Sequence, residues 1–392
     1  MMKLNKIKNI KFYKLLYYTF LFLYFGYYII IISSNYGSNV SSTTIKFLRY
    51  FIYAGFILKI LITTTSIKKT LEQLLLVVLT YMVYLITNDL KIFEILLIIY
   101  ASKNMEFDSI ARFLEKIIVM FCFVVILSAI LGIIPNYQFF DTDVGRFRYS
   151  LGFTYVSQLP ALLLESMFLN LYNSTKKNKK NINYLKIFFW GGLIFVVYRI
   201  TIVRAMLICG VLLIILYLIY FYNDKFFSNN IIITKFFESI FIICAIFSVI
   251  VMISYNPQSM FFKKLNQLLS TRLELTEQIK QQYNIKIFGN NIKMNGGSST
   301  KYSENTSDYI YIDNLYIQLL YRNGLSSFVI YLVLCTKLMK FSIEQKKYNL
   351  IAMWLFMAAV FSLIGDTIFS PIYNCTWILF WKMEKKNKWK EE

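Results

Sequence analysis

Long apolar runs separated by short polar segments dominate this chain. The runs at residues 12–32, 117–134, 205–222 and 236–254 approach or exceed the roughly 20 residues with which a helix spans a bilayer. Only helices and closed barrels satisfy their backbone hydrogen bonds in lipid. The pattern therefore predicts an all-α, polytopic integral membrane protein in which residues 1–392 form a single transmembrane domain.

The lysines between the runs predict the topology. They gather before the first run and in "SIKKT", "STKKNKKNINYLK" and "KLMKFSIEQKKY", and the positive-inside rule places such segments in the cytoplasm. The uncharged "SSNYGSNVSSTT" and the loop at residues 140–160 then lie outside, and both termini are cytoplasmic. About twelve transmembrane helices are predicted, at residues 12–32, 45–61, 71–86, 90–101, 117–134, 159–172, 187–198, 205–222, 232–254, 315–338, 350–363 and 368–381.

Residues 255–311 form the one long hydrophilic stretch and are predicted to be an extracytoplasmic loop. The first part, "MFFKKLNQLLSTRLELTEQIKQQYN", has apolar residues at helical spacing with charged residues between them. This spacing predicts one amphipathic helix on the membrane surface. "IFGNN" and "MNGGSST" follow, and their glycines and asparagines are typical of turns.

Composition supports a membrane protein and limits the chemistry. The chain is 57% hydrophobic and only 16% charged, against about 25% charged in soluble domains. Because the net charge of +21 follows the lysine-rich segments, it indicates topology and the lipid bilayer as partner, and no nucleic acid is expected. The five cysteines lie in apolar runs without metal-ligand spacing, and no metal or cofactor is predicted. Histidine, the commonest general base, does not occur in the sequence.

The arginines are distributed differently from the lysines. Most fall in segments predicted to face outward: Arg146, Arg148, Arg199, Arg204, Arg272 and, two turns into a predicted helix, Arg322. A guanidinium group can donate two parallel hydrogen bonds to phosphate oxygens. These six arginines therefore predict an anion-binding site on the outer face. The alternative is that each arginine reaches lipid headgroups from a helix end without further function.

Carboxylates and tyrosines accompany these arginines in "SENTSDYIYIDNLYIQLLYRNG". The tyrosines at 302, 309, 311, 316 and 321 suit either an interfacial belt or sugar binding. The acidic residues are Glu304, Asp308 and Asp313. Asp313 precedes Asn314 at the start of an apolar run, and two interpretations stay open: a helix cap, or a base that binds or deprotonates a hydroxyl.

Layout and local motifs together resemble the O-antigen polymerase and ligase-like family of bacterial surface polysaccharide assembly. The motifs are "RFRYSLGFTYVSQLP", "TIVRAMLI", "TRLELTEQIKQQYNIKIFGNN" and "IDNLYIQLLYRNGL", which occur in the family's order and cover about a quarter of the chain. The resemblance implies a GT-C-like membrane fold. "TIVRAMLI" has Val203 where the family pattern has serine, and Tyr155, Val156 and Ser157 stand where histidine and asparagine are frequent.

The resemblance implies a metal-independent glycosyltransferase on the outer face of the bacterial cytoplasmic membrane. It would join undecaprenyl-diphosphate-linked oligosaccharide units into O-antigen, capsular or exopolysaccharide chains, with a flippase and a chain-length regulator as further partners. By motif position, the catalytic candidates are Arg146 or Arg148, Arg204, Arg272 and Asp313. The substrate-binding candidates are Arg199, Arg322, Tyr155, Asn314 and Tyr316.

Two alternatives stay open. A lipid-linked oligosaccharide flippase would have a similar number of helices, but short loops and charges spread through a central cavity. A ligase-type glycosyltransferase is disfavoured because that branch is thought to use an outer-loop histidine, which this sequence lacks. A transporter for an anionic solute would be favoured by Gly- and Pro-interrupted helices, and the four prolines give little support to that class.

Overall fold

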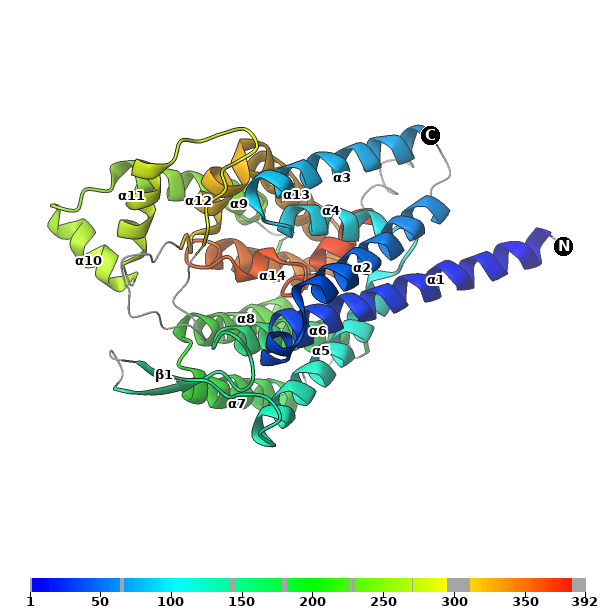
Figure 1. Ribbon diagram of the computed structural model, residues 1–392, viewed down its shortest axis with the longest axis horizontal. Coiled ribbons are helices and arrows are strands. Elements are labelled where there is room, and N and C mark those ends of the chain that lie inside the picture. The colour runs from blue at the N-terminus through cyan, green and yellow to red at the C-terminus, as the bar shows by residue number, and fades with distance from the viewer. Residues whose placement is uncertain are drawn as a thin grey trace.

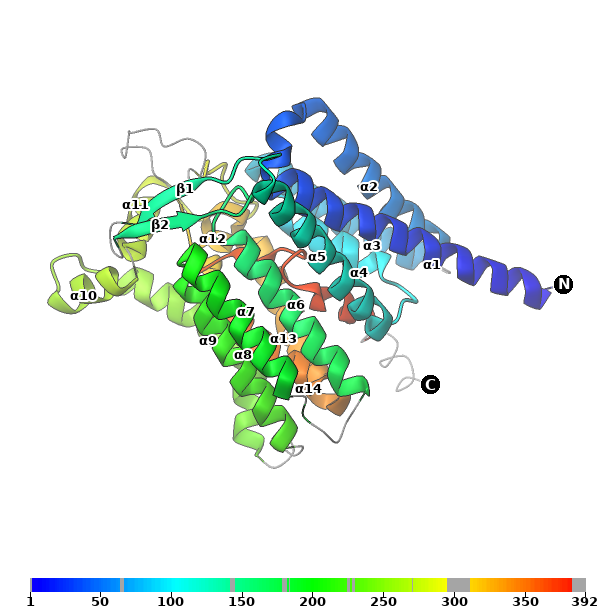
Figure 2. The ribbon, with the colours of Figure 1, turned by 90° about the horizontal axis from the view of Figure 1, so that it is seen from below.

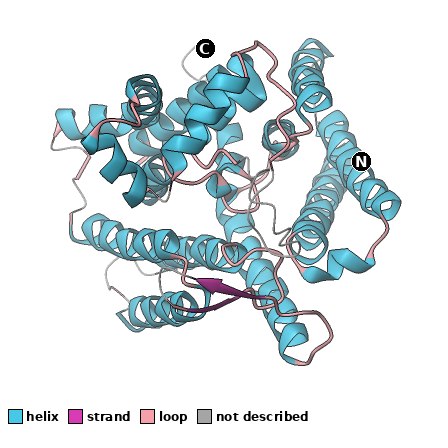
Figure 3. Ribbon diagram, turned by 60° about the vertical axis from the view of Figure 1, so that its left-hand side comes forward, coloured by secondary structure: helices cyan, strands magenta, loops and turns pink. Residues whose placement is uncertain are grey.

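The computed structural model describes residues 2–63, 67–141, 145–177, 182, 184–223, 226–227, 230–269, 271–294 and 311–382. Helices account for most of this chain, and the strands of its described part form one hairpin (Figure 3). The longer helices are α1 (Met2–Gly26), α2 (Ser42–Thr63), α3 (Ile67–Thr87), α5 (Phe107–Ile130), α6 (Gln158–Lys177), α7 (Tyr184–Thr201), α8 (Arg204–Tyr222), α9 (Ile231–Ser254) and α13 (Gly324–Glu344).

The shorter elements connect and cover this bundle. They are α4 (Lys91–Ala101), α10 (Met260–Leu268), α11 (Arg272–Gln282), α12 (Leu315–Gln318), α14 (Asn349–Phe361) and the strands β1 (Gln138–Asp141) and β2 (Arg146–Tyr149). Two π-helical turns, η1 (Tyr27–Ile32) and η4 (Leu319–Asn323), continue α1 and α12. In Figure 2, α6, α7, α8 and α9 run side by side, with α1 and α2 on the other side of the molecule.

A mostly helical, multi-pass membrane architecture is confirmed at the level of helix length and composition. Six helical stretches of the described chain are long and apolar enough to cross a membrane: Phe12–Ile32, Phe107–Ile130, Tyr184–Thr201, Arg204–Tyr222, Ile231–Ser254 and Leu315–Glu344. Helices also occupy the other predicted ranges except the last, but they are shorter or carry more charge. Many large apolar side chains on the outer helices are exposed, as expected for contact with lipid.

The twelfth predicted helix, residues 368–381, is wrong. Two short 3₁₀ turns, Thr367–Phe369 and Cys375–Leu379, are joined here by irregular backbone. Neighbouring side chains form hydrogen bonds with the backbone of this segment. Glu165 Oε1 accepts from the N–H of Cys375 at 2.9 Å, and Ser102 Oγ donates to the carbonyl of Ile378 at 3.2 Å. Irregular backbone is tolerated at membrane depth where protein surrounds it. The segment still returns to the start of α14, since Lys382 Nζ lies 3.0 Å from the hydroxyl of Tyr348.

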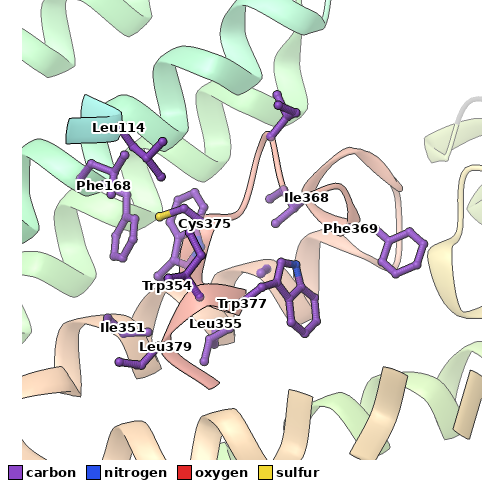
Figure 4. Close-up of a cluster of buried hydrophobic side chains, with 14 of the residues drawn as sticks. Leu114, Phe168, Ile351, Trp354, Leu355, Ile368, Phe369, Cys375, Trp377 and Leu379 are labelled. Atoms are coloured by element: carbon purple, nitrogen blue, oxygen red, sulfur yellow. The ribbon is translucent and has the colours of Figure 1, made fainter. Parts of the chain in front are cut away.

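The apolar side chains of that segment form the centre of the core (Figure 4). Trp354 of α14 stacks on Phe168 of α6, with ring centroids 4.5 Å apart. The indole Nε1 of Trp354 donates to Asn374 Oδ1 at 3.1 Å. Within a membrane, van der Waals packing and internal hydrogen bonds such as these hold helices together.

Two further predictions need correction in the polar segments. Residues 260–284 form two helices, α10 and α11, where one amphipathic helix was predicted. The break occurs at Thr271, whose φ is +64°, and Asn266 Oδ1 accepts from the N–H groups of Leu273 and Glu274 at the start of α11. The strands Gln138–Asp141 and Arg146–Tyr149 pair antiparallel and overlap the predicted loop at 140–160.

Candidate functional site

The hairpin, α10 and α11 lie at one end of the molecule, and α1 begins at the other (Figures 1 and 2). We call the first the hairpin end and the second the opposite end. The segment that enters α12 and the turns after α3 and α14 reach the hairpin end through the contacts described below. Most of the charged residues singled out from the sequence gather here.

Arg272 and Asp313, both predicted site residues, form an ion pair. Arg272 Nε lies 2.9 Å from Asp313 Oδ2, and the two side chains are 34% and 21% exposed. Asn314 is the cap of α12, because its Oδ1 accepts from the N–H groups of Tyr316 and Ile317. The capping role that was open for Asp313 therefore belongs to its neighbour, and the Asp313 carboxylate is left to face Arg272.

Burial raises the pKa of Asp313, and the nearby Asp366 adds to this effect, while Arg272 opposes it. Both carboxylate oxygens of Asp366 also have partners. Its Oδ2 forms an ion pair with Lys91 Nζ, and its Oδ1 accepts from the hydroxyl of Tyr311 at 3.2 Å. The Asp366 carboxylate, together with burial, raises the pKa of Tyr311 well above its ordinary value.

A second, more deeply buried ion pair extends the network. Arg322 Nη1 lies 3.2 Å from Asp89 Oδ2, and Asp89 Oδ1 accepts from the N–H of Lys91 at 3.1 Å. Burial alone would raise the pKa of Asp89, but Lys91 and Arg322 outweigh burial and lower it. Three carboxylates and three cations are thus brought together at this end. We call them the charge cluster: Arg272, Asp313, Asp366, Lys91, Asp89 and Arg322.

Two glycines hold Arg322 in place. Gly289 and Gly324 have φ values of +86° and +88°, and a Cβ on Gly289 would lie 2.0 Å from the carbonyl oxygen of Arg322. The N–H of Asn290 donates to that same oxygen at 3.0 Å. Only glycine permits both the left-handed backbone and this approach. The "IFGNN" turn predicted from the sequence therefore packs directly on the π-helical turn that carries Arg322.

The other arginines lie on the hairpin and on the turn between α7 and α8. Arg146 and Arg148 share one half-buried face of β2, because strand side chains alternate, and β2 contacts α7. Arg199 in the last turn of α7 and Arg204 at the start of α8 are exposed, and neither forms an ion pair within the described residues. We call Arg146, Arg148, Arg199 and Arg204 the hairpin arginines.

Backbone strain marks the same turn. Ile202, two residues before Arg204, has a φ of +56°, which is an outlier for a β-branched residue. The side chain of Ile202 is buried, so packing holds the strained backbone in place. Such strain costs about 1–3 kcal/mol and clusters at functional sites. The Nε atom of Arg146 is also buried and has no hydrogen-bond partner within the described chain.

An apolar cavity of about 190 Å³ adjoins the charge cluster. Side chains of α9, α10, α11 and α12 line it. The wall is largely apolar, and its polar groups come from Ser248, Arg272, Thr276, Glu277 and Asn314. Arg272 therefore belongs both to the charge cluster and to the cavity. A hydrocarbon chain in this cavity would bring a charged headgroup close to Arg272.

Two other predicted substrate-binding residues have different surroundings. Tyr316 is fully buried and its hydroxyl donates to the carbonyl of Ala359 at 2.9 Å, so we assign it to the core. Tyr155 is exposed and lies near enough to Tyr311 to influence its titration. Tyr302, Glu304, Asp308 and Tyr309 lie outside the described residues.

Asp89, Lys91 and Asp366 were not predicted from the sequence as members of the candidate site. The sequence contains a feature that could have identified them: "TND" and "GD" are acidic turns between apolar runs. Charged residues in or next to membrane helices are functional candidates. Within the described ranges, no three His, Cys, Asp or Glu side chains are arranged to hold a metal ion. No protein-family model matches the chain, and the searches of curated proteins and of solved structures find no significant match.

Proposed function

We propose that this chain is a polymerase that joins undecaprenyl-diphosphate-linked oligosaccharide units into a surface polysaccharide. The proposal places the hairpin end on the outer face of the bacterial cytoplasmic membrane, with a GT-C-like arrangement of helices and cytoplasmic termini. The observation that carries it is the pair of exposed arginines without carboxylate partners, Arg199 and Arg204, beside the arginine-bearing strand β2. Guanidinium groups without counter-ions among the described residues favour a ligand with several negative charges, such as a diphosphate.

The reaction forms one bond and breaks another. A sugar hydroxyl oxygen of one unit attacks the anomeric carbon of the other, the bond from that carbon to the diphosphate breaks, and its electron pair leaves with the diphosphate. The hydroxyl proton goes to a carboxylate, for which we propose Asp313. A raised pKa makes Asp313 a stronger base than an ordinary aspartate. The hairpin arginines would stabilise the charge that develops on the leaving diphosphate.

The apolar cavity supplies a place for part of an isoprenoid chain. Its position beside Arg272 suits a substrate whose hydrocarbon and diphosphate parts meet at the membrane boundary. Most of a long polyprenyl chain would remain in the bilayer. Arg272 would therefore orient Asp313 through the ion pair and also contact the lipid part of the substrate.

The test is the length distribution of surface polysaccharide in a strain that lacks this protein. Plasmids supply the wild type, Arg204→Ala, Arg146→Ala or the control Lys263→Ala, which removes an exposed cation on α10. Membrane levels of each variant are measured by immunoblot. We expect single units without long chains in the deletion strain, restoration by the wild type and the control, and failure of both arginine variants.

Other outcomes would redirect the assignment. Accumulation of lipid-linked units on the cytoplasmic leaflet would favour a flippase. Long free polymer that is not attached to its final acceptor would favour a ligase-type transferase. Unchanged polysaccharide in the deletion strain would refute a role in this assembly.

A further inference from the structure

A polar cavity of about 560 Å³ lies away from the charge cluster, at the opposite end of the bundle. It is lined by the first turns of α5, the last turns of α6, the start of α7 and Tyr18 of α1. Since α5 ends and α6 begins next to the hairpin, these parts of the helices lie at their other ends. The proposed reaction has no use for a site here.

Positive charge dominates the wall of this cavity. Arg112, Lys116 and Lys186 line it together with a single carboxylate, Glu115. Both Glu115 oxygens are already hydrogen-bonded by the side-chain amides of two asparagines of α6, each at 2.5 Å. The carboxylate is thus satisfied by neutral donors and does not form an ion pair with the neighbouring cations.

Two of these cations lack an acidic partner among the described residues. In this part of the chain Arg112 donates to the carbonyl of Asp108 and the hydroxyl of Ser109 of its own helix, at 3.2 and 3.4 Å. Lys116 has no hydrogen bond or ion pair in the part of the chain that the structure describes. The two lie four positions apart on one face of α5, where like charges repel by a few tenths of a kcal/mol. An anion between them would remove that repulsion.

The surroundings of the cavity are those of a lipid boundary. Near Lys186 on α7, the side chains of Leu185 and Phe188 are 82% and 84% exposed, as expected for side chains that contact hydrocarbon. Inside the cavity, the rings of Tyr18 and Phe113 meet edge to face with centroids 5.0 Å apart. Basic pockets between membrane helices at the cytoplasmic side bind the headgroups of anionic lipids.

We propose that this cavity binds the phosphate of an anionic phospholipid headgroup in the leaflet at the opposite end, which the lysine distribution predicts to be the cytoplasmic one. Arg112 and Lys116 would contact the phosphate oxygens, and the hydroxyl of Ser109 would add a neutral donor. The aromatic pair would cover the glycerol backbone. This inference is independent of the polymerase proposal, because it uses no residue of the charge cluster or the hairpin arginines.

The experiment uses the full-length purified protein in neutral detergent. Dioctanoyl phosphatidylglycerol or dioctanoyl phosphatidylcholine is titrated, and the apparent affinity is taken from the rise in the thermal unfolding midpoint. We expect phosphatidylglycerol to raise the midpoint more than phosphatidylcholine does. Since each juxtamembrane cation contributes about a fivefold gain in affinity, Arg112→Gln/Lys116→Gln should bind phosphatidylglycerol roughly thirtyfold more weakly.

Two controls separate this site from general charge effects. Lys340→Gln removes an exposed cation of α13 outside the cavity and should keep the wild-type affinity. Arg112→Lys keeps the charge and should retain most of the binding. Equal effects of the two lipids on the wild type, or equal losses in Lys340→Gln and the double variant, would overturn the proposal. A response to sn-glycerol 1-phosphate as large as that to phosphatidylglycerol would overturn the lipid assignment in favour of a soluble phosphate ester.

Discussion

Arg322 Nη1 lies 3.2 Å from Asp89 Oδ2, and these side chains are only 15% and 4% exposed. The pair joins the turn between α3 and α4 to the π-helical turn that follows α12. It thereby connects the N-terminal helices to the segment that carries Asp313. Buried charges of this kind are stable only while both partners are present.

Loss of one partner should therefore cost more than loss of both. We expect Asp89→Asn and Arg322→Gln each to lower the free energy of unfolding by about 3–5 kcal/mol, because each leaves a buried group unpaired. The double variant should lose much less than the sum of the two. Chemical unfolding in mixed micelles measures these values. The Lys235–Glu238 pair, whose lysine side chain is 65% exposed, is the control and should contribute less than about 1 kcal/mol. Additive losses at Asp89 and Arg322 would contradict the coupling.

The pH dependence of stability should reveal the same carboxylate. The pKa of Asp89 is lower in the folded protein than in the unfolded chain, so the stabilisation is present above the unfolded value of about 4 and is lost as the pH falls through the folded value. The stability difference between wild type and Asp89→Asn should therefore be constant near neutral pH and shrink below about pH 4. Unfolding curves at several pH values test this, and a gap that persists at the acidic end would contradict it.

The pKa of Asp313 is shifted in the opposite direction to that of Asp89, and the shift should appear in the pH dependence of activity. Burial raises its pKa, so the fraction of ionised base falls at a higher pH than for an ordinary aspartate. We expect the rate of polymer formation in membranes to decline as the pH falls through this raised value. Asp313→Asn should lose about 10²–10⁴-fold in rate, which is the usual contribution of a general base. Full activity of Asp313→Asn would remove Asp313 from the mechanism, whatever the fate of the arginine variants.

Gly324 and Gly289 should not tolerate a side chain. Both have positive φ and meet backbone atoms of the other segment, so Gly324→Ala should destabilise by more than about 1 kcal/mol and displace Arg322 from Asp89. Gly192 of α7 is the matched control, since a Cβ there meets nothing within 4 Å. Gly192→Ala should be neutral or stabilising by about 0.5–1 kcal/mol. Thermal unfolding of the two variants in one detergent compares them directly.

Glu94 of α4 is a buried carboxyl group held by three tyrosines. It accepts from Tyr24 at 3.0 Å and from the hydroxyls of Tyr28 and Tyr53. We expect Tyr24→Phe to cost about 1–3 kcal/mol, because it removes the donor to Oε2 of a buried carboxyl group. Tyr198→Phe, which removes a hydroxyl without a hydrogen-bond partner in the described chain, should change stability by less than about 0.5 kcal/mol. Equal effects of the two substitutions would show that the Glu94 contacts contribute little.

Hydrophobic length predicted most of the helices but could not predict the form of the last apolar segment. Residues 350–363 and 368–381 look alike as sequences, yet only the first is largely one α-helix, and the second contains short helical turns joined by irregular backbone. The second is surrounded by α4, α5, α6 and α14, where Glu165 and Ser102 provide the hydrogen bonds that a helix would have made internally. An apolar composition indicates that a segment is removed from water, but it does not tell whether lipid or protein surrounds the segment.

Local sequence properties were enough to predict a helical membrane protein and the ranges of most helices, and to select Arg272 and Asp313 as candidate site residues. Each of these depends on local properties: run length, lysine position and residue chemistry. Which charged residues form ion pairs depends on the tertiary structure. Asp89 is far from Arg322 along the chain, and so is Lys91 from Asp366. Burial requires these pairings, because a charge enclosed by protein needs a partner. The identity of the partner follows from the packing of helices, which no local sequence pattern specifies.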